Sequence, residues 1–197
     1  MWQRIVVLVA ASSVLCAAGV ACAAEFVVRP GGDSKVVFTS KAPTETFEGR
    51  TTQMTGRLTL EPGAVGDSIT VHLEVDAASL DTGRKLRNKH MRENHLEVAK
   101  FPHMMFDGAA VLVGAGAKLE PGKNVAFQLE GTFTLHGVSR RLRCDAQATM
   151  TSQGGVAFSA NFPVTLSDYD IKRPEFLFMK LAETQQVRVS ATAASQP

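Results

Sequence analysis

The sequence predicts an all-β protein, an antiparallel barrel or sandwich of about eight to nine short strands with one helical insertion. Three observations predict this fold class. Apolar and polar residues alternate in several short runs, turn-forming residues separate these runs, and the polar segment 84–100 lacks the alternation. Alternation with a period of two gives a strand one dry and one wet face, and regularly spaced short strands are typical of barrels and sandwiches.

Residues 1–24 have the pattern of a secretory signal peptide. Arg4 supplies a positive charge, residues 5–20 form an apolar run, and residues 21–24 are small residues suited to cleavage before Glu25. A membrane anchor is the alternative, but the run is shorter than the roughly 20 residues that a membrane-spanning helix needs. We therefore expect the mature chain to be exported.

The composition of the mature chain limits the function classes. Removing Arg4 from the 21 basic residues leaves 20 against 19 acidic residues, so we expect no general attraction to nucleic acid. Cys144 is the only cysteine beyond the signal region, so packing rather than an internal disulfide must hold the domain together. Cys144 shares a face with Leu142 and Ala146, which favours a small buried hydrophobe over a reactive thiol.

The strands follow one another along the chain. The alternation is clearest at residues 68–76 and 125–135, and a turn at His136-Gly137 follows the second of these runs. Glycine accepts positive φ, so it suits a two-residue hairpin connection. Weaker alternation predicts further strands at residues 26–29, 35–40, 54–60, 103–111, 142–150, 155–165 and 185–193.

The segment from 84 to 100 is predicted to form one or two short helices in a long connection between strands, because it is rich in helix formers. Pro102 ends this segment by restricting Phe101 to extended geometry. With this insertion, the sequence predicts one domain at residues 25–194 and a polar tail at residues 195–197.

Several motifs resemble those of the YceI-like family. The central signature of that family is similar to ASLDTG at 78–83, RNKHMR at 87–92, LE at 96–97 and KFPHMMF at 100–106. Its second signature is similar to GTFTLHGVSR at 131–140, and its opening pair of strands to FEG at 47–49 followed by GRL at 56–58. The resemblance covers essentially the whole mature chain.

The resemblance implies a single lipocalin-like antiparallel β-barrel of about eight strands, located in the bacterial periplasm. Some members of the family hold a long polyisoprenoid or another amphiphile in an elongated apolar cavity. The chain departs from the common pattern at Asn88, where many members have an acidic residue, and at His95-Leu96, where many have paired aromatic residues. Both departures lie in the helical connection, so they concern the ligand more than the fold.

Motifs for catalysis or metal binding are missing from the sequence. It has no Gly-x-Ser-x-Gly elbow, no His-Glu-x-x-His pair, no phosphate loop and no dinucleotide-binding glycine cluster. His90 and His95 would lie about 140° apart on a helix, so they do not share a face. We therefore expect no enzyme, no cofactor and no metal. A hydrolase acting on an amphiphile, with Ser79 and His90 as nucleophile and base, is an alternative without motif support.

Apolar side chains that are predicted to face inward form the candidate binding site. The mature aromatic residues are nearly all phenylalanine, which has no hydrogen-bonding group. An eight-stranded barrel is either filled by side chains or holds a small ligand, and both arrangements fit this pattern. The candidate ligand-binding residues are Phe38, Leu58, Val71, Leu73, Met104, Phe106, Phe127, Leu129, Phe133, Phe158 and Phe162.

Basic residues of the helical connection are candidates for contact with an anionic head group, namely Arg84, Arg87, Lys89 and Arg92. A solvated face is the alternative interpretation of this cluster. As partners we expect an amphiphilic, polyisoprenoid-like lipid, no nucleic acid and at most peripheral membrane contact. The sequence leaves both a monomer and a homodimer as alternatives. The alternative function from another class is an interaction module of an envelope stress or redox system.

Overall fold

The computed structural model describes residues 23–61, 69–111, 114, 117–176 and 179–196. Residues 1–22, which form most of the predicted signal peptide, lie outside the described residues. The first strand, β1 (Ala24–Val28), begins at the last residue of that predicted segment.

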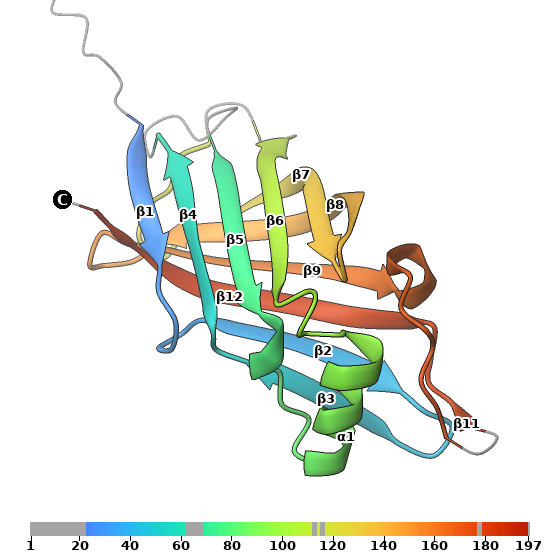
Figure 1. Cartoon of the computed structure of the whole chain (residues 1–197). Helices are drawn as coiled ribbons and strands as arrows, with labels where there is room; N and C mark the ends of the chain where they lie inside the picture. The colour runs from blue at the N-terminus through green and yellow to red at the C-terminus, as the bar shows by residue number, and fades with distance from the viewer. Residues whose placement is uncertain (1–22, 62–68, 112–113, 115–116, 177–178, 197) are drawn as a thin grey trace, which may run out of the picture.

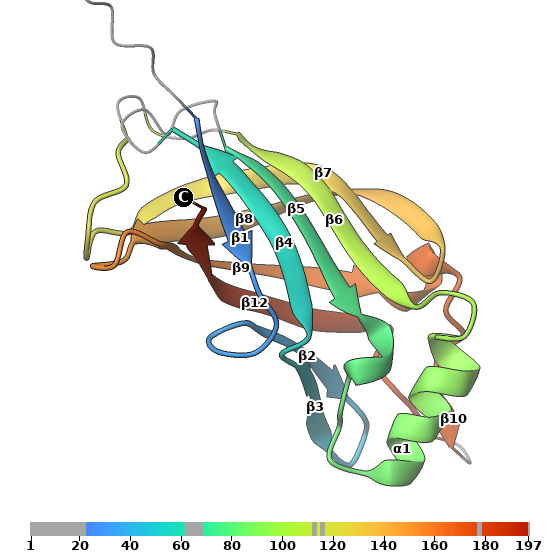
Figure 2. The same ribbon diagram turned by 60° about the vertical axis from the view of Figure 1, so that its left-hand side comes forward.

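Eight strands close into an antiparallel barrel, which confirms the predicted fold class (Figures 1 and 2). In spatial order, β1 is followed by β4 (Met54–Leu60), β5 (Thr70–Asp76), β6 (His103–Val111), β7 (Val125–Leu135), β8 (Val138–Met150), β9 (Val156–Thr165) and β12 (Thr184–Ser195). Pairing of Phe26 with Ser195 and of Val27 with Ala194 closes the barrel between β1 and β12.

A hairpin of β2 (Lys35–Lys41) and β3 (Thr46–Thr51) extends the sheet beyond the barrel. β2 pairs with β12 between Gln186 and Ser190, on the same edge that β1 uses further along. The alternation pattern predicted β2 but not β3. Two short strands, β10 (Glu175–Phe176) and β11 (Met179–Lys180), form a separate small hairpin that was also not predicted.

The predicted helical insertion is present and lies at the β2–β3 end of the barrel (Figures 1 and 2). It consists of helix α1 (Lys85–His90) and a π-helical turn η2 (Met91–His95), and a 3-10 turn η1 (Ala77–Ser79) precedes it directly after β5. Another 3-10 turn, η3 (Leu166–Tyr169), follows β9. Asn88 shapes the start of the insertion, because its Oδ1 accepts from the N–H and hydroxyl of Thr82 while its Nδ2 donates to Asp81.

The edge of β3 is partly covered by the chain that leads into α1. Arg50 and Asp81 exchange backbone hydrogen bonds, each with an N–O distance of 2.9 Å. This bridge fixes the connection between η1 and α1 against the β2–β3 hairpin.

The turn between β7 and β8 has the geometry that the sequence predicted. His136 has a φ of 53° and Gly137 a φ of 74°. Positive φ at both central residues is the mark of a type I′ turn, whose twist matches that of the strands it joins.

Side chains fill the barrel at the end where β1 begins and β4 ends. Five of the residues there are at most 2% exposed, namely Phe26, Val28, Leu60, Ile69 and Val156. Phe26 and Val28 lie on β1, Leu60 on β4 and Val156 on β9, and Ile69 immediately precedes β5, so burial of their apolar surface favours the closed barrel. The two ends of the barrel therefore differ, one being filled and the other covered by helical turns.

We expect Gly131→Ala to lower the free energy of unfolding by about 1–3 kcal/mol, the usual cost of overpacking. Gly131 pairs with Gly108 across β6 and β7, and a Cβ on Gly131 would lie 2.2 Å from the Asp107 carbonyl oxygen and 2.5 Å from Gly108 Cα. Urea unfolding measures the change. Gly114→Ala is the control, because its Cβ would meet nothing within 4 Å. Equal stabilities of the two variants would contradict this close approach.

Candidate ligand-binding cavity

A cavity of about 570 Å³ lies at the helical end of the barrel. Pockets for small molecules commonly measure about 300–1,000 Å³ and have mainly apolar walls. The walls here come from inward residues of the barrel strands and of β2, and the rim comes from β3, α1, η2 and the segment around β10. The cavity therefore has an apolar interior and a more polar entrance.

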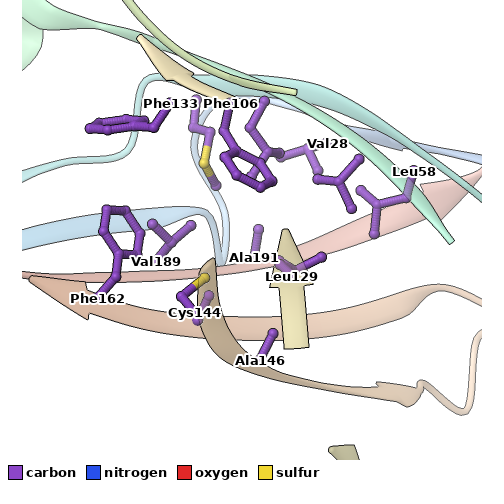
Figure 3. Close-up of a cluster of buried hydrophobic side chains, with 14 of the residues drawn as sticks. Val28, Leu58, Phe106, Leu129, Phe133, Cys144, Ala146, Phe162, Val189 and Ala191 are labelled. Atoms are coloured by element: carbon purple, nitrogen blue, oxygen red, sulfur yellow. The ribbon is translucent and has the colours of Figure 1, made fainter. Parts of the chain in front are cut away.

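Eight of the eleven predicted ligand-binding residues line this cavity. They are Phe38, Leu73, Met104, Phe106, Leu129, Phe133, Phe158 and Phe162. The rings of Phe133 and Phe162 point toward each other from β7 and β9, with centroids 5.6 Å apart in an edge-to-face arrangement (Figure 3).

The other three predicted residues lie in the filled part of the barrel. Leu58, Val71 and Phe127 are 3%, 7% and 7% exposed and are not among the lining residues. Leu58 lies beside Val28, away from Phe133 and Phe162 (Figure 3). These side chains pack behind the residues that line the cavity and do not contact the cavity itself.

Several lining residues were not among the predicted candidates. Val187 and Val189 on β12 have the same inward alternation as the predicted residues, so the pattern contained the signal that could have found them. Leu86 on α1 lines the cavity although it is 66% exposed, and Ile171 reaches the cavity from the segment after η3. Their place depends on how the connections fold over the barrel, which alternation does not show.

Arg84 and Arg87 line the cavity, whereas Lys89 and Arg92 do not. Arg87 donates through Nε to Thr82 Oγ1, through Nη1 to Glu45 Oε1 and through Nη2 to the Thr82 carbonyl, at 2.8–2.9 Å. Its guanidinium also lies 3.8 Å from the centroid of the Phe47 ring, a cation–π contact. Arg87 therefore connects α1 to the β2–β3 hairpin.

The remaining basic candidates differ in their contacts. Arg92 donates through Nη2 to the Leu80 carbonyl at 2.8 Å and so holds the chain before α1. Lys89 is exposed. The Arg84 side chain is 70% exposed and lies 3.5 Å from Glu45 Oε2. Of the four, Arg84 is the residue that both lines the cavity and has a mostly exposed side chain.

His136 lies in a tightly packed cluster, although it occupies a two-residue turn between strands. Its side chain is 10% exposed, with Nε2 3.0 Å from Glu97 Oε2 and Nδ1 3.0 Å from the Tyr169 carbonyl. The Phe101 ring packs against it with centroids 4.6 Å apart. Because both polar partners are acceptors, the ring donates to both only when doubly protonated. The cluster joins the β7–β8 turn to the helical insertion and to η3.

The two histidines of the helical insertion both line the cavity. His95 Nδ1 is 3.0 Å from the Lys172 carbonyl, and burial, followed by the charge of His90, lowers the His95 pKa. Among the described residues, no three His, Cys, Asp or Glu side chains are placed to hold a metal ion. No helix in the described part of the chain has the length and apolar character needed to span a membrane.

Cys144 is a buried wall residue, as its alternation predicted. It is 8% exposed and lines the cavity beside Leu129. Burial, with a smaller contribution from Asp145, raises the pKa of its thiol to about 11. It therefore packs as a small hydrophobe at neutral pH.

The model of the YceI-like domain matches residues 26–193 of this chain. The chain belongs to the YceI-like family. The match covers both signatures and the opening strands on which the resemblance was based, and it includes all eight predicted wall residues.

A curated relative of this YceI-like chain is a UPF0312 protein of Vibrio parahaemolyticus. It is 27% identical over 131 residues, which are 64% of this chain and 65% of the relative. The matched region therefore spans just under two thirds of the relative's length.

Solved structures share the YceI-like fold. A polyisoprenoid-binding domain from Saccharophagus degradans has a TM-score of 0.68 at 17% identity, over 89% of this chain and 100% of that one. BcnA of Burkholderia cenocepacia has a TM-score of 0.66 at 17% identity, over 82% and 96%. A YceI protein of Campylobacter jejuni has a TM-score of 0.57 at 19% identity, over 76% and 84%. At these identities, the likeness establishes the fold.

We expect Cys144 to be alkylated slowly by iodoacetamide in the folded protein at about pH 8, because the thiolate is the reactive form. Its pKa of about 11 exceeds the ordinary 9.0 by about two units, so the thiolate fraction is about a hundredfold smaller than in the unfolded chain. Mass spectrometry of the chain that starts at Glu25 follows the reaction. Equal rates for native and urea-unfolded protein would contradict a buried thiol.

We expect Glu97→Gln to lower the free energy of unfolding near neutral pH and to lower it less in acid. Hydrogen bonds from Lys100 and then His136 lower the Glu97 pKa from its ordinary 4.5. A carboxyl with a lowered folded pKa stabilises the fold above its unfolded pKa, and that contribution is lost as the pH falls through the folded pKa. The stability difference between wild type and variant should therefore shrink below about pH 4.5.

Urea unfolding from about pH 6 to about pH 3 measures this dependence. Glu93→Gln is the matched control, because Glu93 is an exposed carboxylate of the same insertion. A difference for Glu97→Gln that stays constant across this range would show that its effect is not electrostatic.

Proposed function

We propose that this protein binds a long-chain isoprenoid or a similar amphiphilic lipid, with the apolar tail inside the barrel cavity, and that it does so without catalysis. One observation carries the proposal: a cavity of about 570 Å³ whose lining includes Phe38, Phe106, Phe133, Phe158 and Phe162. Phenylalanine offers a tail large contact area and no hydrogen-bonding group.

Burial of hydrocarbon supplies enough free energy for such binding. Each CH₂ group moved out of water contributes about 0.8 kcal/mol, so ten buried carbons contribute on the order of 8 kcal/mol before ordering costs. Apolar contacts discriminate weakly per methylene, so the depth of the cavity should set the preferred chain length. The filled end of the barrel, where Phe26 and Leu60 pack, would then limit how far a tail reaches.

The rim provides a place for a charged head group. Arg84 is the candidate contact, because it lines the cavity and its side chain is mostly exposed. The internal contacts of Arg87 and Arg92 give these residues a role in holding the insertion instead. The fold shared with a polyisoprenoid-binding domain of another bacterium supports the proposed ligand class.

We further propose that binding takes place in the periplasm. The signal-peptide pattern of residues 1–24 and the resemblance to an exported family support this location. The protein would then hold a lipid that is insoluble in the surrounding water.

The alternative functions receive less support from the geometry. Ser79, the nucleophile of the hydrolase alternative, contacts Thr51 Oγ1 at 2.5 Å and donates to the Asp76 carbonyl at 2.6 Å, and it does not line the cavity. Its candidate base, His90, lines the cavity on α1. An interaction module would be favoured by a barrel filled along its whole length.

The proposal is tested by native mass spectrometry of protein purified from a periplasmic extract. We expect a chain that starts at Glu25 and carries a lipid, or that takes up an added polyprenyl lipid. A ligand-free mass together with no uptake would contradict lipid binding, and retention of residues 1–24 in the cytoplasm would contradict the periplasmic location.

In the same experiment, Val187→Trp should reduce lipid uptake at least about tenfold. The indole would occupy space in the cavity and exclude about two CH₂ groups, which are worth about 1.6 kcal/mol together. Arg188→Trp is the matched control, because Arg188 is exposed on the outer face of the same strand. Equal uptake by the two variants would place the lipid outside the cavity.

A further inference from the structure

Two buried polar atoms in the cavity wall have no hydrogen-bond partner among the described residues. They are Ser40 Oγ and Gln185 Oε1, and the two residues are 1% and 7% exposed. Both residues line the cavity. Unpaired buried polar atoms are uncommon in native proteins because each costs free energy, so a pair of them in one cavity calls for an explanation.

These two residues lie across from each other on neighbouring strands. β2 and β12 pair antiparallel with Thr39 facing Gln186, so one step along each strand brings Ser40 opposite Gln185. Side chains at facing positions share one side of the sheet, with Cβ atoms about 4.5–5.5 Å apart. Here that side is the cavity, since Phe38, two residues before Ser40, lines it as well. The two residues that carry the unpaired atoms are therefore neighbours in the cavity wall.

The contacts of the Gln185 amide define what the pair can bind. Its Nε2 donates to the Ala182 carbonyl at 2.6 Å, which leaves Oε1 as the free acceptor. The Ser40 hydroxyl can donate and accept. A ligand hydroxyl would satisfy both atoms by donating to Gln185 Oε1 and accepting from Ser40 Oγ. A hydrocarbon satisfies neither atom, and an ionised phosphate has no proton to donate to Gln185.

We propose that Ser40 and Gln185 form a polar subsite that binds a hydroxyl group of the lipid. The inference rests on the proposed lipid-binding function and adds the chemical class of the ligand, an amphiphile with a free hydroxyl. An anionic group does not fit this subsite, and its contact belongs at the rim near Arg84.

The test compares geranylgeraniol with the hydrocarbon that has hydrogen in place of its hydroxyl. Displacement of the neutral fluorescent probe N-phenyl-1-naphthylamine gives the affinity of the wild type and of the variants Ser40→Ala and Gln185→Met for each compound. Comparing variants for one compound at a time removes the difference in water solubility between the two. We expect each variant to lose about tenfold in affinity for the alcohol and less than about twofold for the hydrocarbon.

Thermal unfolding without ligand distinguishes a binding role of Ser40 from a structural one. If Ser40 stabilised the fold, its replacement would lower the thermal midpoint. Because Ser40 Oγ is unpaired, Ser40→Ala should leave the thermal midpoint unchanged or raise it. Thr39→Ala and Gln186→Leu are the matched controls, because neither residue lines the cavity. They should leave the affinities for both compounds unchanged.

The outcomes separate the two proposals. Failure of the wild type to bind either compound would overturn the proposed lipid binding. Binding of both compounds with equal losses in Ser40→Ala and Gln185→Met, or with no loss, would overturn the hydroxyl subsite and leave lipid binding in place. A lower thermal midpoint for Ser40→Ala with equal losses would assign the serine to the stability of the wall.

Discussion

The shared edge of β12 determines the shape of the whole molecule. Its C-terminal residues Ala194 and Ser195 pair with β1 and close the barrel, while residues 186–190 of the same edge pair with β2. Because β1 and β2 occupy successive parts of one edge, the wall closes tightly at one end and diverges at the other (Figure 2). The filled core lies at the closed end, and the cavity lies where the β2–β3 hairpin leaves the barrel.

Polar contacts hold the parts that surround the opening, whereas apolar contacts form its interior. Arg87 joins α1 to the hairpin through Glu45 and Phe47, and His136 joins the end of the insertion to the β7–β8 turn through Glu97. Such contacts are directional, so they fix the position of short elements that bury little apolar surface. Inside the cavity, the walls carry few polar atoms, and the pair on β2 and β12 is therefore a specific chemical feature of an otherwise apolar surface.

Local patterns in the sequence predicted the strands and the β7–β8 turn, because alternation and positive φ depend on neighbouring residues. Alternation could not separate Phe127, which lies in the filled end, from Phe133, which lines the cavity on the same strand. Both side chains face inward and differ only in their position along the barrel axis. The register of all eight strands determines that position. Sequence patterns also could not predict the structural role of Arg87, because its partner Glu45 lies 42 residues away in the chain. Alternation did not predict β3, because its buried positions Gly49 and Thr51 are not large apolar residues, and only the family resemblance placed the FEG segment at 47–49 in a strand.

The position of β3 at the end of the sheet order has a consequence for the protein's behaviour at high concentration. An outermost strand presents free backbone groups to which a strand of another molecule can add, and this is a common route to aggregation. The backbone bridge between Arg50 and Asp81 occupies that edge near the C-terminal end of β3, and Glu48 adds an exposed charge two residues before the bridge. The chain that covers the opening of the barrel thus also keeps separate molecules from joining their sheets.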